Sequence, residues 1–153
     1  MNKFTKAVLL TGLFVGTTDI MAAIISQWAR SGSYPDRMFN YIAGGLIGLE
    51  RSMDGGNWAA LLGLFNHYAI AMTFTLFFFW VLPKVKILQF NKYAIGMLYA
   101  VAINLVMKFI VLPLTPLPGS DYVVANEFLG WMILGTVLGI PIAYNAYKYY
   151  AIE

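Results

Sequence analysis

Four long apolar runs dominate this chain and constrain its fold more than any other feature. They cover residues 7–28, 58–82, 93–114 and 123–147. A helix needs about 20 predominantly apolar residues to cross the hydrocarbon core of a bilayer, and each run meets that length. The runs are continuous rather than alternating, which argues against membrane-spanning strands. The sequence therefore predicts an all-α membrane protein, one domain over residues 1–153, with four transmembrane helices in a bundle.

The basic residues predict how these spans are oriented. The first run continues to Trp28 without a cleavage site, so we interpret it as an uncleaved span and not a signal peptide. The four predicted spans then place six lysines on one side of the membrane. Three arginines lie on the other side, where nearby acidic residues offset their charge. The lysines are Lys3, Lys6, Lys84, Lys86, Lys92 and Lys148, and the arginines are Arg30, Arg37 and Arg51. The positive-inside rule predicts that both termini are cytoplasmic.

The connection between the first two runs, residues 29–57, predicts an additional short helix over about 34–53. Ser33 is a candidate N-cap, with Pro35 in the first turn and Asp36 at the capping-box position. Gly55 and Gly56 would end the helix. Its apolar stretch is too short to span, so we expect an interfacial helix, a re-entrant helix or a helix packed across the mouth of the bundle.

Ionisable residues inside the apolar runs are the first candidates for function. About 60% of the chain is apolar, yet Asp19, His67 and Lys108 lie within predicted spans. A charged side chain at the centre of a membrane helix costs roughly 3 kcal/mol. At 1.5 Å per residue, Asp19 and His67 both lie near the middle of a core about 30 Å thick. Lys108 lies nearer the outer boundary. The predicted polar site also includes Asn66, Asn104 and, at the outer mouth, Glu127.

Two interpretations of this predicted site remain open. Asp19 and His67 could form a proton-linked pair, because histidine titrates near neutral pH and protonation would change the charge balance in a medium of low dielectric constant. The pair could instead be a buried hydrogen bond that only holds the first two spans together. Lys108 could neutralise Asp19 or extend its long side chain outward to the interface.

Small or polar residues form a stripe along one face of each predicted span. Small residues allow helices to approach closely in lipid, so these stripes predict packing faces. Gly12, Gly16, Asp19, Ala23 and Ser26 follow alternating steps of four and three. The other stripes are Ala60, Gly63, His67 and Ala71 in the second span, Gly96, Ala100, Asn104 and Lys108 in the third, and Gly135 and Gly139 in the fourth.

Several chemistries have no support in the sequence. The chain has one histidine and no cysteine, and no helical pair at metal-ligand spacing. Haem ligation would require His67 with Met21 or Met72, but eight methionines are ordinary in an apolar membrane protein. No serine lies in a hydrolase motif, no glycine pair forms a phosphate loop, and no basic patch favours nucleic acid. We therefore expect no enzyme activity, no cofactor, no metal and no nucleic-acid partner.

The order of several motifs resembles that of a known group of proteins. These motifs are Gly16-Thr17-Thr18-Asp19-Ile20, Arg37 to Gly45, Gly55-Gly56, Leu61 to Tyr68, Val111 to Leu114 and Gly139 to Ala143. The chain thereby resembles small four-helix bacterial inner-membrane proteins with a layout related to the YagU-like family. The resemblance implies a location in the bacterial inner membrane and a link to acid resistance. It supplies no catalytic residues.

These observations lead to two functional hypotheses. The first is a proton-linked or small-solute role that uses Asp19 and His67. The second is a non-catalytic accessory subunit of a larger membrane complex. Four helices make a thin wall around any pore, so we expect the lipid bilayer as the main partner, together with further copies of the chain or a larger membrane protein.

Overall fold

The computed structural model describes residues 1–117 and 127–152, and every regular element within these ranges is a helix. This confirms the prediction of an all-α protein. In chain order the helices are α1 Lys3–Ser31, α2 Met38–Ile47, α3 Leu49–Asp54, α4 Gly56–Val81, α5 Lys92–Val106, α6 Glu127–Leu134 and α7 Ile140–Tyr150. Two short 3-10 turns, Leu82–Lys84 and Lys86–Gln89, connect α4 to α5. A π-helical turn, Met107–Val111, and a 3-10 turn, Leu112–Leu114, extend α5, and a second π-helical turn, Gly135–Gly139, joins α6 to α7.

Three helical segments are long and apolar enough to cross a membrane. They are Lys3–Ser31, Gly56–Lys84 and Lys92–Leu114, and they contain the first three predicted spans. The fourth predicted span, 123–147, begins on residues outside the described ranges. Its described part is helical from the start of α6 to the end of α7.

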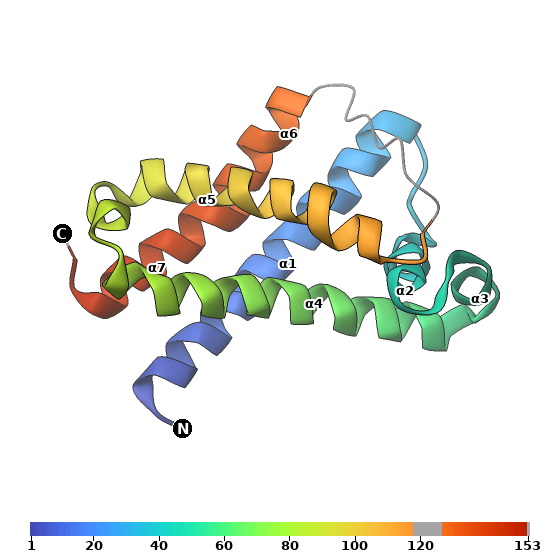
Figure 1. The fold of residues 1–153 in the computed structure, drawn as a ribbon. Helices are drawn as coiled ribbons and strands as arrows, with labels where there is room; N and C mark the ends of the chain where they lie inside the picture. Colours follow the sequence, from blue (N-terminus) through green and yellow to red (C-terminus); the bar gives the residue numbers. More distant parts are fainter. Residues whose placement is uncertain (118–126, 153) are drawn as a thin grey trace.

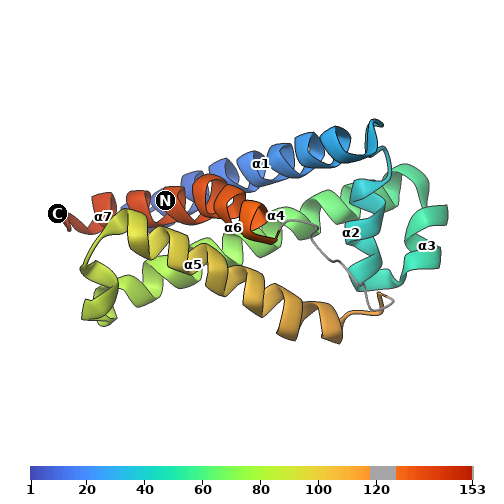
Figure 2. The same cartoon turned by 90° about the horizontal axis from the view of Figure 1, so that it is seen from above.

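The long helices run alternately in opposite directions. Figures 1 and 2 show both termini at the same end of the molecule as the connection between α4 and α5, with α2 and α3 at the opposite end. We call the first the proximal end and the second the distal end. Asn2 caps the start of α1 by accepting from the Thr5 amide at 2.7 Å, and Asn91 caps α5 in the same way. Gly32, with φ at +68°, ends α1.

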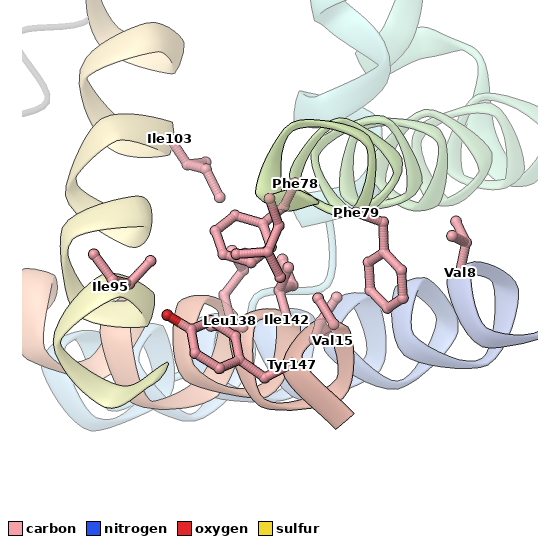
Figure 3. Packing of buried hydrophobic residues seen from close by; sticks show 12 residues of the cluster. Val8, Val15, Phe78, Phe79, Ile95, Ile103, Leu138, Ile142 and Tyr147 are labelled. Atoms are coloured by element: carbon pink, nitrogen blue, oxygen red, sulfur yellow. The ribbon is translucent and has the colours of Figure 1, made fainter. Parts of the chain in front are cut away.

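Apolar side chains from all four long segments meet in one core in the proximal half (Figure 3). Phe78 and Phe79 of α4 are almost fully buried, as is Tyr147 of α7. Val8 and Val15 come from α1, Ile95 and Ile103 from α5, and Leu138 and Ile142 from the segment around the second π-turn. Tyrosine hydroxyls in this region donate to backbone carbonyls: Tyr99 to Phe74 at 2.6 Å, Tyr150 to Phe79 at 2.8 Å, and Tyr147 to Leu88. The hydroxyls of these three tyrosines are therefore satisfied within the protein.

Glycines allow backbones to touch where helices cross. A Cβ added at Gly139 would lie 2.0 Å from the carbonyl oxygen of Gly96 and 2.8 Å from the Cβ of Ala100. The predicted stripes of the third and fourth spans therefore pack against each other. A Cβ at Gly63 would lie 1.8 Å from the carbonyl oxygen of Phe39. This stripe residue of the second span contacts α2, so part of that stripe accommodates the short helix.

A neighbouring helix compensates for Pro141, which the sequence places inside the fourth span. Proline has no amide hydrogen, so it leaves the carbonyl of Val137, four residues earlier, without its usual helical donor. Thr18 of α1 donates its hydroxyl to this carbonyl at 2.8 Å. The π-turn before Pro141 widens the helix at the same point. The helical path therefore continues into α7.

The segment predicted as one helix over 34–53 forms two helices, α2 and α3. The predicted cap is wrong: α2 begins at Met38, and Ser33 instead bonds with Ser31. Gly48, with φ at +85°, separates α2 from α3, because few other residues adopt this backbone conformation readily. The predicted end is confirmed, since α3 stops at Asp54 with Gly55 as its C-cap.

The α2–α3 hairpin is tied to the start of α4. Asn40 is 7% exposed, and its amide donates to the carbonyls of Ser52 at 2.8 Å and Gly56 at 3.0 Å. Together with the contact at Gly63, these bonds hold α2 across the distal part of α4. The short helix is thus packed on another helix along its length.

Candidate functional site

A cavity of about 580 Å³ opens at the distal end, where the long helices no longer meet in the apolar core. It lies between the second half of α1, the connection 32–37, the start of α2, and α6. Its size falls within the roughly 300–1,000 Å³ range of small-molecule sites. We call it the distal cavity.

One face of α1 forms a wall of this cavity. Asp19, Ala23, Ser26 and Arg30 all line it and follow one another at steps of three or four, so they share a helical face. The small-residue stripe predicted for the first span therefore has two parts. Its first part packs on α4, where Gly12 lies against Met72 and Gly16 lies against Tyr68. Its second part borders open space, because small side chains there do not fill the gap between α1 and α6.

The charges of the distal cavity are arranged along its length. Asp19 is half-buried, while Arg30, Asp36 and Arg37 are exposed. Asp19 lies twelve residues before the end of α1 at Ser31, which is about 18 Å along the helix. The cavity thus holds a carboxylate at its inner end and two guanidinium groups toward the end of the helix. A carboxylate in such a partly dry site attracts a positively charged group or a proton.

His67 of α4 contacts the backbone of α1. Its Nε2 lies 2.8 Å from the carbonyl oxygen of Gly16. A carbonyl oxygen only accepts, so the proton of this bond belongs to Nε2. The bond joins α4 to α1 three residues before Asp19. Within the described ranges, however, no direct hydrogen bond or ion pair links the two side chains.

Asn66, Asn104 and Lys108 do not line the distal cavity. Asn66 and Asn104 are half-buried on α4 and α5, and Lys108 is exposed in the π-turn that extends α5, 5.8 Å from the ring centre of Phe109. Glu127 is the first residue of α6, but its side chain is outside what the structure describes. Of the five predicted residues with described side chains, only Asp19 lines the distal cavity.

Sequence reasoning missed several residues of the cavity. Arg30 continues the face of Asp19 by one further turn, so extending the stripe would have found it. Tyr34, Arg37 and Tyr41 come from the connection 32–37 and from α2. No periodic signal links them to α1, because their position depends on how α2 packs on α4.

Across residues 1–117 and 127–152, no three side chains of His, Cys, Asp or Glu gather where a metal ion could bind. Comparison with known proteins finds no matching family model, no matching curated protein and no matching solved structure. The resemblance to YagU-like proteins therefore stays a prediction, and the geometry of the site carries the functional argument.

Proposed function

We propose that this protein is a bacterial inner-membrane protein that crosses the bilayer four times as a helix bundle, with both termini in the cytoplasm. Three segments have the length and apolarity of spans. The continuous helical path through α6 and α7 would supply the fourth. The proximal end carries the six lysines named above, as the positive-inside rule favours for a cytoplasmic face.

The absence of cysteine makes this topology directly testable. Single-cysteine variants Ser33→Cys at the distal end and Lys86→Cys at the proximal end would be treated with a membrane-impermeant maleimide in intact cells. We expect labelling of Ser33→Cys before permeabilisation and of Lys86→Cys only after it. The reverse pattern would overturn the orientation, and labelling of both in intact cells would contradict the four-span topology.

We propose further that the distal cavity binds a small solute that carries a positive charge, in a manner linked to protons through Asp19. The observation that supports this is the cavity itself, which reaches inward along α1 to a half-buried carboxylate. A protonated Asp19 would no longer attract the cation, so solute and proton would compete for one group. The arginines near the end of α1 would favour a solute that also has an anionic group, such as a zwitterion.

His67 would act in this proposal as a positioning residue. Its bond to the Gly16 carbonyl ties α4 to α1 just before Asp19, which holds the carboxylate at a defined level of the cavity. The variant His67→Gln keeps a side-chain donor, whereas His67→Phe removes it. If the role is positioning, Gln preserves binding better than Phe does.

The test is thermal unfolding of the purified protein in detergent with glycine, putrescine or succinate at pH 8 and at pH 5. We expect glycine or putrescine to raise the melting temperature at pH 8 and to do so less at pH 5, with succinate inactive. Asp19→Asn abolishes the effect, whereas the control Asp36→Asn, which changes an exposed acid of the same cavity, retains it. An unchanged response in Asp19→Asn would remove the basis of this proposal.

The competing function, a non-catalytic accessory subunit, makes a different prediction. It requires stable co-purification of a larger membrane protein in mild detergent, with no stabilisation by any of the three solutes. A homogeneous monomer or homo-oligomer that responds to glycine or putrescine would exclude it.

A further inference from the structure

A second groove lies at the other end of the molecule, between α1 and α5, with α7 as its floor. Its volume is about 570 Å³. Leu10 and Phe14 form the wall on α1, Tyr93 forms the wall on α5, and Pro141 and Tyr144 line it from α7. Leu10, Phe14 and Tyr93 are each more than half exposed, so the groove opens sideways along the surface of the helices. We call it the proximal groove.

Lys92 lies at the end of this groove that is nearest the termini. Its Nζ is 5.9 Å from the ring centre of Tyr93 and 5.6 Å from that of Tyr144. Lys92 is half-buried, and among the described residues no carboxylate lies within ion-pair distance of it. It also occupies the first turn of α5, where the helix dipole favours an anion. This end of the groove therefore attracts negative charge.

Two further lysines lie on the other helices of the groove, on the side toward the chain termini. Lys6 lies one turn before Leu10 on α1, and Lys148 lies one turn after Tyr144 on α7, and both are exposed. Residues four apart share a helical face, so each lysine continues a face that lines the groove. Each of the three helices around the groove thus carries a lysine toward its terminal side, and Lys92 is the one that contacts the groove residues Tyr93 and Tyr144.

We propose that the proximal groove binds one anionic phospholipid, with an acyl chain along α7 and the phosphate at Lys92, while Lys6 and Lys148 add positive charge toward the termini. Charge complementarity selects the headgroup, and the apolar lining between Leu10 and Pro141 accepts the chain. Tyr93 and Tyr144 lie at the polar end, as amphipathic rings do at a membrane interface. The inference rests on the proposed membrane insertion but not on the solute role, because the two cavities lie at opposite ends.

The test measures binding of phosphatidylglycerol and phosphatidylcholine, with identical acyl chains, to the purified full-length protein by native mass spectrometry. We expect tighter binding of phosphatidylglycerol. The change Lys92→Gln should weaken it about fivefold, and Lys6→Gln or Lys148→Gln should weaken it less. The control Lys84→Gln removes a lysine at the same end that lies over the Trp80 ring, outside the groove, and should leave binding unchanged.

A second variant separates the groove from the surface charge. Leu10→Trp keeps every lysine but fills the groove, and we expect it to weaken phosphatidylglycerol binding at least as much as Lys92→Gln does. Equal binding of the two lipids would overturn the proposal. So would a loss of phosphatidylglycerol binding in Lys84→Gln as large as that in Lys92→Gln, or no loss in Leu10→Trp. Displacement of the lipid by millimolar inorganic phosphate would also overturn it, because the site would then recognise phosphate alone.

Discussion

The proximal and distal halves of the molecule are built from the same long helices but are packed in opposite ways. In the proximal half, aromatic rings from α4 and α7 fill the space between helices, and tyrosine hydroxyls bond to carbonyls. In the distal half, α1 presents alanine, serine and aspartate, and about 580 Å³ stays open. Large side chains that face inward fill the space between two helices, whereas small ones leave a cavity there.

The difference also explains where polar groups occur. The buried tyrosine hydroxyls of the proximal half bond to backbone carbonyls of neighbouring elements, because an unsatisfied hydroxyl would be costly away from water. Asp19 faces a cavity and not a partner side chain in the described ranges. We expect the proximal half to carry stability and the distal half to carry function, and four substitutions test this division.

The largest effect is expected for Phe79→Ala in the proximal core. Phe79 is fully buried, with its ring centre 6.2 Å from that of Phe4 and 6.0 Å from that of Tyr149. Removing the ring should lower the free energy of unfolding by about 4 kcal/mol. Unfolding in mixed micelles with increasing dodecyl sulfate, followed by circular dichroism, measures this change.

Phe77→Ala is the matched control for this prediction, because Phe77 lies on the same helix but is 50% exposed. We expect it to change the free energy of unfolding by less than about 1 kcal/mol. Equal losses for the two variants would show that burial in the proximal half does not determine stability.

The next effect is expected for Gly139→Ala, where α7 begins and the chain crosses α5. The added Cβ would meet the Gly96 carbonyl at 2.0 Å, and a backbone atom cannot move aside cheaply. We expect a loss of about 2 kcal/mol in the same unfolding measurement. Gly45→Ala serves as the control, since its Cβ would make only an ordinary contact at 3.6 Å with Thr115. A neutral Gly139→Ala would mean that this crossing can open.

A smaller effect is expected for Thr18→Val, which keeps the shape of the side chain but removes the donor to Val137. The Val137 carbonyl would lose the bond from Thr18 that compensates for Pro141, at a cost of about 1 kcal/mol. Thr73→Val is the control, because the Thr73 hydroxyl bonds only to Ala69 within its own helix. If both variants unfold alike, the bond across helices adds nothing to stability.

The smallest effect on stability is expected for Ala23→Leu in the distal cavity. Ala23 is exposed to open space, so the larger side chain should change the free energy of unfolding by less than about 0.5 kcal/mol. It should nevertheless remove any stabilisation by glycine or putrescine, because it occupies the cavity. Ala143→Leu, in the filled proximal core, should lower stability by about 2 kcal/mol. A tolerated Ala143→Leu would contradict the contrast between the two halves.

Much of the local structure could be predicted, and the packing faces predicted around Gly96 and Gly139 are found in contact with each other. The break in the short helix was missed because Gly48 lies in an apolar stretch that favours helix on composition alone. The sequence also could not predict the hydrogen-bond partner of His67. Two residues at the same depth in a membrane can face different neighbours, and the rotation of α4 directs Nε2 to the Gly16 carbonyl.

The sequence by itself determined the helical class and the extent of three span-length helices, because the length and apolarity of a segment are properties of that segment alone. Glycines and prolines marked where most of these segments stop or bend. Only the tertiary structure decided that Thr18 compensates for Pro141, that α2 lies across α4, and that Asp19 faces open space. Those outcomes depend on the spacing and rotation of whole helices, which arise from many weak contacts between residues far apart in the chain.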